Sequence, residues 1–404
     1  METQPNMNGE CSKEPENDVE AEVEVISEVL SAMLYYERHA AAKFRRQAKA
    51  LKSLDDADRK ALTPTLSSHF REALRCAAEN QKFLDQIINC GRVIFDDNSN
   101  YIKAMDGLNH GKVPSEHYMS KARSTLRQIV RDWSEEGRPE RESCYNRVLE
   151  AMREIYPEKH ERYDVKSLVC GSGLARLNWE LLKDGFSVTG NEFSYFMILA
   201  SNFMLNACKE KEQFTIYPYL LDFSNCWSYS DALRPVKIPD IDPSSQLDNT
   251  SRPNSFSMCA GDFVTAFEGY EQIFDTVITV FFIDTAVNPF KYIQTIKRLL
   301  KPGGRWINFG PLTYHFEDSE EDSIELPFDL LLEQIKRYGF EMEIVEENRD
   351  KPSYYTKNPW SMLGYQYLCG FFQARLPVAM EKKEDEKIVE NNDVTKKRTS
   401  EQMN

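Results

Sequence analysis

Residues 166–192 read KSLVCGSGLARLNWELLKDGFSVTGNE, a stretch in which an apolar run, two glycines and a helical pattern follow one another. Leu168 to Cys170 indicate a strand that enters a turn at Gly171 and Gly173, and a helix and a second short strand ending at Glu192 follow. This is the pattern of a first βαβ unit. Glycines let the backbone approach a ligand closely, and an acidic side chain about 20 residues on accepts ribose hydroxyls. We therefore expect an adenosine-containing cofactor.

The composition is that of a large α/β protein. The 404 residues, 41% of them hydrophobic, suffice for one large domain and a second unit. No apolar stretch is long enough to span a membrane and the N-terminus is polar and acidic, so we expect neither a membrane partner nor a signal peptide. The net charge of −15 argues against a nucleic-acid partner, because binding phosphates needs clustered Lys and Arg. The nine cysteines lack metal-ligand spacing, which predicts no metal site and reduced thiols in the cytoplasm or nucleus.

Four regions are predicted along the chain. Residues 1–20 and 379–404 are charged and lack an apolar period, which predicts disorder. Residues 21–155 carry apolar residues at helical spacing and form an N-terminal helical region. Residues 156–378 are predicted to form an α/β domain. Within it, the irregular segment 215–254 is rich in Pro, Asp, Ser and Asn, and its aromatic residues favour a folded lid.

Strand patterns recur after this segment and indicate the fold class. Strands are predicted at Ser255–Cys259, Thr276–Ile283 and Arg305–Phe309. Phe340–Val345 and Tyr365–Leu376 indicate two further strands without a helix between them, an antiparallel hairpin that closes a parallel sheet. We predict an α/β fold, a Rossmann-like sheet with an antiparallel terminal hairpin, preceded by an N-terminal helical unit.

The choice among adenosine cofactors depends on the glycine turn. Arg176 stands where a dinucleotide motif has its third glycine, which argues against NAD and FAD, and the chain has no P-loop motif for ATP. S-adenosyl-L-methionine needs only a close backbone turn and a carboxylate for the ribose. Asp262 and Phe263 follow a later strand. The Asp262 carboxylate is expected to accept a hydrogen bond from the adenine amino group, and Phe263 is expected to flank the adenine ring. The turn Lys301–Gly304 is common before the fifth strand of Rossmann-like methyltransferases.

Several specific strings occur in one order along the chain. They include RDWSEEGRPER (131–141), GSGLARLNWE (171–180), GNEFSYFM (190–197), FFIDTA (281–286) and KPGGRWINFGPLTYHF (301–316). With them, about residues 115–377 resemble the carnosine N-methyltransferase family. The glycine turn of that family reads PGAGLGRL, where this chain has Cys170, Ser172 and Ala175. These residues are small, so we expect the turn to be kept.

The resemblance implies an S-adenosyl-L-methionine-dependent N-methyltransferase that methylates the imidazole ring of carnosine, a histidine-containing dipeptide, to give anserine. It also implies a homodimer. The implied cofactor residues are Gln128, Arg131, Gly171, Glu192, Asp262 and Phe263. Gln128 and Arg131 are three residues apart and therefore lie on one face of the predicted helix, opposite an apolar stripe. Without the resemblance, this pattern would favour a helix face exposed to solvent. Arg131 is expected to bind the methionine carboxylate.

Asp284 ends the predicted strand VITVFFID, at the edge of the sheet where open α/β folds bind ligands. Imidazole is nucleophilic only when neutral, and only through the nitrogen without a hydrogen. Our hypothesis is that Asp284 accepts the hydrogen of the distal ring nitrogen. The nitrogen nearer the side-chain attachment is then free to attack.

Three further residues complete the predicted substrate site. His315 follows another strand end, in PLTYHF, and the resemblance gives it a catalytic, substrate-contacting role. Tyr365 and Tyr367 alternate with Gln366 and are expected on one face of the last strand. The resemblance places their hydroxyls near the polar groups of the dipeptide.

Three alternatives remain open from the sequence. The acceptor could be free histidine, another histidine-containing peptide or a protein histidine, because the fold is indifferent to it. A catalytically silent cofactor-binding protein is opposed by intact Asp284, His315 and Glu192, and a dehydrogenase is opposed by Arg176.

Overall fold

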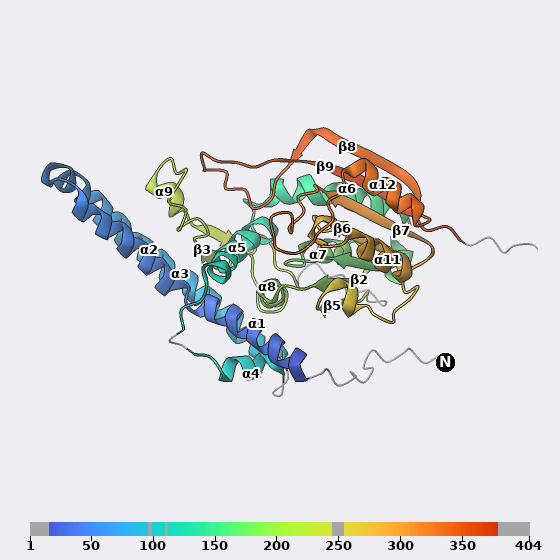
Figure 1. Cartoon of the computed structure of the whole chain (residues 1–404), viewed down its shortest axis with the longest axis horizontal. Helices are drawn as coiled ribbons and strands as arrows, with labels where there is room; N and C mark the ends of the chain where they lie inside the picture. Colours follow the sequence, from blue (N-terminus) through green and yellow to red (C-terminus); the bar gives the residue numbers. More distant parts are fainter. Residues whose placement is uncertain (1–15, 96–98, 110–111, 245–253, 379–404) are drawn as a thin grey trace, which may run out of the picture.

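The computed structural model describes residues 16–95, 99–109, 112–244 and 254–378. Figure 1 shows two parts, a set of long helices on one side and a helix-covered sheet on the other. None of the helices within these ranges is long and apolar enough to cross a lipid bilayer.

The N-terminal part is built from helices. They are α1 (Glu16–Leu34), α2 (Tyr36–Ala50), the short η1 (Leu51–Ser53), α3 (Asp56–Ile94), α4 (Asn100–Asp106), α5 (Glu116–Trp133) and α6 (Arg138–Ile155). Residues 16–20, predicted to be disordered, are helical, because a helix extends beyond its packed residues at low cost. The rest of the predicted disordered regions, 1–15 and 379–404, lies outside the described residues.

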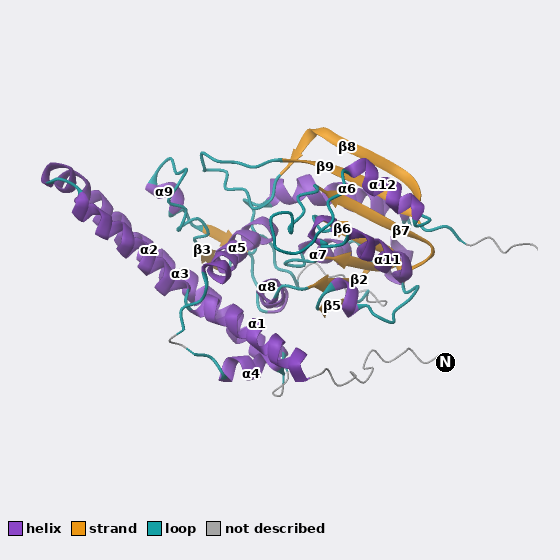
Figure 2. Cartoon of the chain, viewed as in Figure 1, coloured by secondary structure: helices purple, strands orange, loops and turns teal. Residues whose placement is uncertain are grey.

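The sheet has the predicted class, with five parallel strands and an antiparallel pair at one edge (Figure 2). Its order is β5-β2-β1-β6-β7-β9-β8. The strands are β1 (Lys166–Cys170), β2 (Ser187–Glu192), β5 (Phe256–Ala260), β6 (Phe274–Val280), β7 (Leu300–Gly310), β8 (Glu341–Ser353) and β9 (Tyr367–Arg375). The predicted turn Lys301–Gly304 lies inside β7, where the register to β6 shifts.

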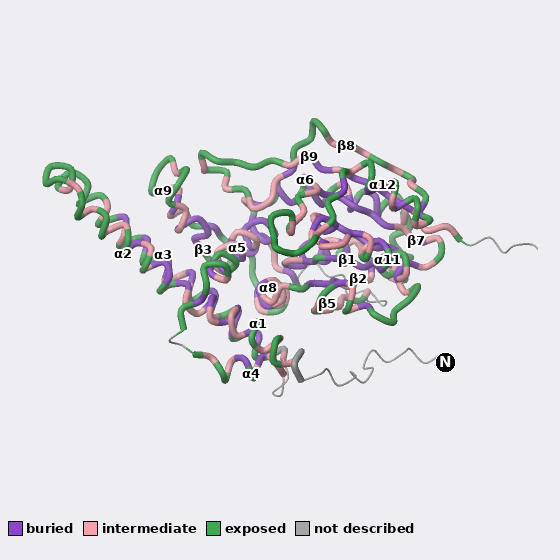
Figure 3. The backbone as a smooth tube through the Cα atoms, viewed as in Figure 1, coloured by how far each residue is buried: buried purple, intermediate pink, exposed green. Residues whose placement is uncertain are grey.

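Helices cover both faces of the sheet and bury its apolar side chains (Figure 3). They are α6 and α7 (Arg176–Lys183) on one face and α10 (Phe263–Ala266), α11 (Pro289–Leu299) and α12 (Phe328–Arg337) on the other, and α8 (Tyr195–Asn206) follows β2 along the chain. One core joins the sheet to α10, α11 and α12, and the opposite core joins it to α6 and α7. A third core joins the N-terminal helices to α8, so the helical part is attached beside the first βαβ unit.

The described part of segment 215–254 is folded. Strands β3 (Phe214–Ile216) and β4 (Val236–Ile238) pair antiparallel, and α9 (Tyr229–Ala232) lies between them. Asn80 on α3 accepts a hydrogen bond from the backbone N–H of Tyr217 (2.8 Å) and donates one to its carbonyl (2.9 Å). The segment is therefore fastened to the N-terminal helices. Residues 245–253 of the predicted lid lie outside the described residues.

Candidate active site

The glycine turn follows β1 directly and leaves open space on one side. Gly171 and Gly173 have φ angles of +65° and +52°, in the left-handed region that favours glycine. A Cβ atom added at Gly171 would lie 2.5 Å from the ring of Phe282, whereas one at Gly173 would meet nothing within 4 Å. Ala175, which replaces a family glycine, also has a positive φ of 59°. Ala175 therefore adopts the left-handed conformation that favours glycine.

Glu192 braces this turn from the end of the neighbouring strand. Its side chain is buried, and its Oε2 accepts a hydrogen bond from the backbone N–H of Gly173 (2.7 Å). Its Oε1 accepts from the N–H groups of Phe193 (3.0 Å) and Ser194 (2.8 Å). Burial raises the pKa of Glu192, and these backbone bonds oppose the shift. The carboxylate is therefore fixed beside the open space at Gly173.

Asp262 and Phe263 follow β5, whose last residue is paired with Glu192. Asp262 is exposed, and its Oδ1 accepts from the N–H groups of Val264 (3.0 Å) and Thr265 (3.1 Å). The ring of Phe263 is 2% exposed and packs in the aromatic core. The structure places both residues just beyond the carboxyl end of β5, and their contacts with adenine stay predictions.

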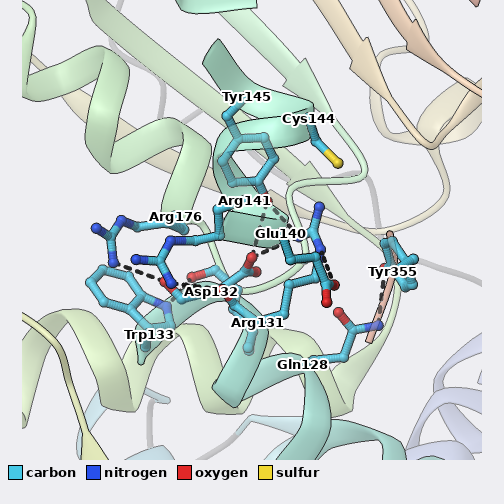
Figure 4. Close-up of polar contacts among 12 residues, drawn as sticks. Gln128, Arg131, Asp132, Trp133, Glu140, Arg141, Cys144, Tyr145, Arg176 and Tyr355 are labelled. Carbon is cyan, nitrogen blue, oxygen red and sulfur yellow. Dashed lines mark hydrogen bonds and ion pairs between the residues drawn. The ribbon is translucent and has the colours of Figure 1, made fainter. Parts of the chain in front are cut away.

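Arg131 is buried near the end of α5, so the alternative of a solvated helix face does not apply to it (Figure 4). Its Nη1 donates to Asp132 Oδ1 and to the hydroxyl of Tyr145, both at 2.6 Å. Its guanidinium lies 5.0 Å from the ring centre of Tyr145 and 4.7 Å from that of Tyr355. Gln128, one turn earlier, donates to the Tyr355 hydroxyl (2.9 Å). Nε of Arg131 is buried and has no hydrogen-bond partner among the described residues.

Gly137 fixes the sharp turn between α5 and α6 that holds Arg131 in place. A Cβ atom there would lie 2.2 Å from the carbonyl oxygen of Val130 and 2.4 Å from that of Arg131. We expect Gly137→Ala to lower the free energy of unfolding by about 2 kcal/mol, because backbone atoms must move to admit the methyl group. Chemical denaturation measures this change. Gly364→Ala is the control, because a Cβ atom at Gly364 would meet nothing within 4 Å, and equal stability of the two variants would contradict the prediction.

Asp284 lies at the expected edge of the sheet but not at the end of a strand, so that part of the prediction is wrong. Strand β6 ends at Val280, and Asp284 belongs to a short 3-10 turn, η3 (Ile283–Thr285). Phe281 has a positive φ of 52°, which turns the chain out of the sheet. The apolar residues after Val280 continue the strand pattern, so the sequence does not mark this end.

The two carboxylate oxygens of Asp284 have different surroundings. Oδ2 accepts hydrogen bonds from the backbone N–H (2.9 Å) and the hydroxyl (2.7 Å) of Thr313. Oδ1 is buried and has no hydrogen-bond partner among the described residues. A buried carboxylate oxygen without a donor is costly. This arrangement therefore fits a ligand that donates a hydrogen bond to Oδ1.

Tyr367 and His315 lie near Asp284, and Tyr365 differs from its prediction. Tyr367 is the first residue of β9, which starts beyond the carboxyl end of β7. Burial raises the pKa of Tyr367, and the charge of Asp284 raises it further. The exposed His315 donates its backbone N–H to the Asp284 carbonyl (3.0 Å). Tyr365 precedes β9 and is 71% exposed, so the two tyrosines do not share a strand face.

Sequence reasoning missed two aromatic residues that connect the two halves of this site. The ring of Phe281 lies 5.1 Å from that of Tyr355, beside Arg131, and 5.7 Å from that of Tyr367. Tyr355 lies in an aperiodic stretch, and Phe281 belongs to an apolar run, so neither residue carries a local signal. Thr313, which holds Asp284, was also missed, although it lies within one of the family-specific strings.

Comparisons with known proteins identify the family of this chain. The family model described as "Carnosine N-methyltransferase" matches residues 108–378. Relatives with that name include the protein of Rattus norvegicus, 38% identical over 90% of this chain and 88% of its own. The protein of Schizosaccharomyces pombe is 37% identical over 88% of this chain and 97% of its own. Among solved structures, phosphoethanolamine N-methyltransferase 2 of Haemonchus contortus is 16% identical, with a TM-score of 0.38 over 67% of this chain and 61% of that chain.

Proposed function

Since the chain belongs to the carnosine N-methyltransferase family, we propose that it transfers a methyl group from S-adenosyl-L-methionine to the imidazole ring of carnosine and releases anserine. The observation that supports the site most directly is Asp284 Oδ1, a buried carboxylate oxygen without a hydrogen bond to any described residue. An imidazole N–H supplies the donor that this oxygen lacks.

The described residues fit the cofactor. The open side of Gly173 admits a ligand against the backbone, and Glu192 is fixed beside it as an acceptor for ribose hydroxyls. Arg131 is charged and buried, and its guanidinium carries five N–H donors, so it can bind the methionine carboxylate in addition to Asp132 and Tyr145. When bound, S-adenosyl-L-methionine supplies a methyl group on a positively charged sulfur, and the carbon–sulfur bond breaks as the ring nitrogen takes up that group.

The residues of the chain hold the acceptor ring in its reactive form. Asp284 Oδ1 accepts the hydrogen of the distal ring nitrogen, which selects the tautomer whose other nitrogen has a free lone pair. The same carboxylate stabilises the positive charge that develops on the ring, and then takes the ring proton or passes it to water. Thr313 fixes the orientation of Asp284 through two hydrogen bonds to Oδ2. His315, Tyr367 and Tyr365 contact the rest of the dipeptide.

Mass spectrometry of the products tests this function. Purified protein is incubated with S-adenosyl-L-methionine carrying a labelled methyl group and, separately, with carnosine, free histidine or a histidine-containing protein extract. We expect label in carnosine, at the ring nitrogen of anserine as located by NMR. Label only in another acceptor would replace carnosine as the substrate. Cofactor binding without transfer to any acceptor would identify a silent binding protein.

We also propose a cytoplasmic location, which extends to the nucleus, and a homodimer. The eight cysteines within the described ranges are all free, as thiols are in a reducing compartment. Trp227 and Trp360 are exposed and lie on two segments that an isolated antiparallel β-bridge joins between Cys226 and Ser361. Exposed aromatic side chains of this kind are common in protein–protein interfaces. Light scattering after gel filtration measures the mass of the assembly in solution.

A further inference from the structure

Glu140 is a buried carboxylate that has no role in the proposed reaction. It lies in the first turn of α6, within the family-specific string 131–141, and is 8% exposed. Its Oε1 lies 3.3 Å from Nε of Arg131. Burial raises the pKa of Glu140, whereas the charge of Arg131 lowers it. The carboxylate therefore faces the residue proposed to bind the cofactor carboxylate (Figure 4).

The same carboxylate holds the start of the segment between β8 and β9, residues 354–366. Its Oε1 accepts from the backbone N–H of Thr356 (2.5 Å), and its Oε2 accepts from that of Lys357 (3.0 Å). Thr356 has a positive φ of 52°, a conformation that is costly for a β-branched residue. Such strain persists only where the surroundings enforce it, and it is frequent at functional sites. The two hydrogen bonds to Glu140 provide that constraint here.

The segment 354–366 begins in the cofactor half of the site and ends in the substrate half. Tyr355 packs its ring against the Arg131 guanidinium and accepts a hydrogen bond from Gln128. The Tyr355 ring also contacts Phe281, which contacts Tyr367 at the other end of the segment. Among the contacts described above, Glu140 is the one charged side chain that lies against Arg131 and also accepts hydrogen bonds from the backbone of this segment.

We propose that Glu140 is a positioning residue that couples cofactor binding at Arg131 to the placement of segment 354–366 and thus of Tyr367. The inference rests on the proposed function, because it takes Arg131 as the residue that binds the cofactor carboxylate. A cofactor carboxylate bound to Arg131 fixes the guanidinium, and the guanidinium then fixes Glu140 and the amides of Thr356 and Lys357. Carnosine therefore binds more tightly after the cofactor, and the coupling is reciprocal.

Two measurements on the full chain test this coupling, with S-adenosyl-L-homocysteine as a non-reactive cofactor probe at saturating concentration. Lys357 is exposed, so the rate of tryptic cleavage after it reports on the segment. We expect the probe to slow this cleavage at least fivefold in the wild type and to have no effect in Glu140→Gln. By calorimetry we expect the probe to tighten carnosine binding about tenfold in the wild type and less than about threefold in the variant.

Glu142→Gln is the matched control, because it removes the same charge from an exposed position on α6. It should keep both wild-type responses. If Glu140→Gln keeps them too, the inference is wrong. Glu140→Asp, which keeps the charge but draws the carboxylate back by one methylene from the amides of Thr356 and Lys357, decides the question if Glu140→Gln does not fold: a weaker response supports the coupling, and wild-type responses overturn it. The cleavage assay distinguishes a failure of this inference from a failure of the proposed function. It needs only the cofactor probe, so cleavage after Lys357 responds to the probe even if carnosine does not bind.

Discussion

Asp284→Asn is expected to lower kcat/KM for carnosine by about 1,000-fold, within the range for loss of a positioned proton acceptor. The amide keeps the shape of the carboxylate, and its oxygen still accepts from Thr313. Its NH2 group then occupies the place of Oδ1 and presents a donor where the ring N–H needs an acceptor. Because Asp284 does not contact the cofactor in this proposal, calorimetry should find the affinity for S-adenosyl-L-homocysteine within about twofold of wild type.

Two further variants separate the role of Asp284 from general effects of charge and packing. Asp318→Asn removes the same charge from an exposed position beyond His315 and should leave kcat/KM unchanged. Thr313→Val removes one of the two hydrogen bonds to Oδ2 and should lower kcat/KM about tenfold, because the backbone bond remains. Comparable losses of turnover and cofactor affinity in Asp284→Asn would contradict the tautomer hypothesis.

The fold could be predicted from the sequence wherever local pattern and burial agree. The first βαβ unit and the antiparallel hairpin are marked by apolar runs separated by glycine or polar turns, and both predictions are confirmed. The hairpin strand predicted to end at Val345 runs on to Ser353. β8 is the edge strand, so its polar residues face solvent and need no apolar alternation. An edge strand is therefore poorly delimited by hydrophobic periodicity.

The site could be predicted only in part, because its connections depend on tertiary packing. Gly171 and Glu192 belong to one local unit with a fixed spacing, and the structure joins that unit through the Glu192–Gly173 hydrogen bond. Tyr355 contacts Gln128 across 227 positions of sequence. No local period records such a contact, and the positive φ of Phe281 and Thr356 is likewise set by surroundings rather than by residue type.

Glu192→Gln is expected to weaken S-adenosyl-L-homocysteine binding by about 10- to 100-fold, the equivalent of one or two hydrogen bonds to a charged acceptor. The carboxylate accepts from three backbone N–H groups and has further lone pairs for ribose hydroxyls. A glutamine oxygen can replace only one of the carboxylate oxygens, and its NH2 group opposes the N–H of Gly173 or of Phe193. Calorimetry measures the loss. Glu210→Gln, at an exposed position between α8 and β3, is the control for charge and should bind the probe normally.

The pH dependence of cofactor affinity distinguishes a ribose acceptor from a purely structural Glu192. Burial raises the pKa of Glu192 above that of an exposed glutamate, so protonation begins at a higher pH than usual. The ionised form accepts the ribose hydroxyls, and affinity should therefore fall as the pH is lowered through the raised pKa. Glu192→Gln is neutral at every pH, so its weaker affinity should not change over that range. An equally steep fall in affinity in the variant would mean that another group titrates and that Glu192 only braces the glycine turn.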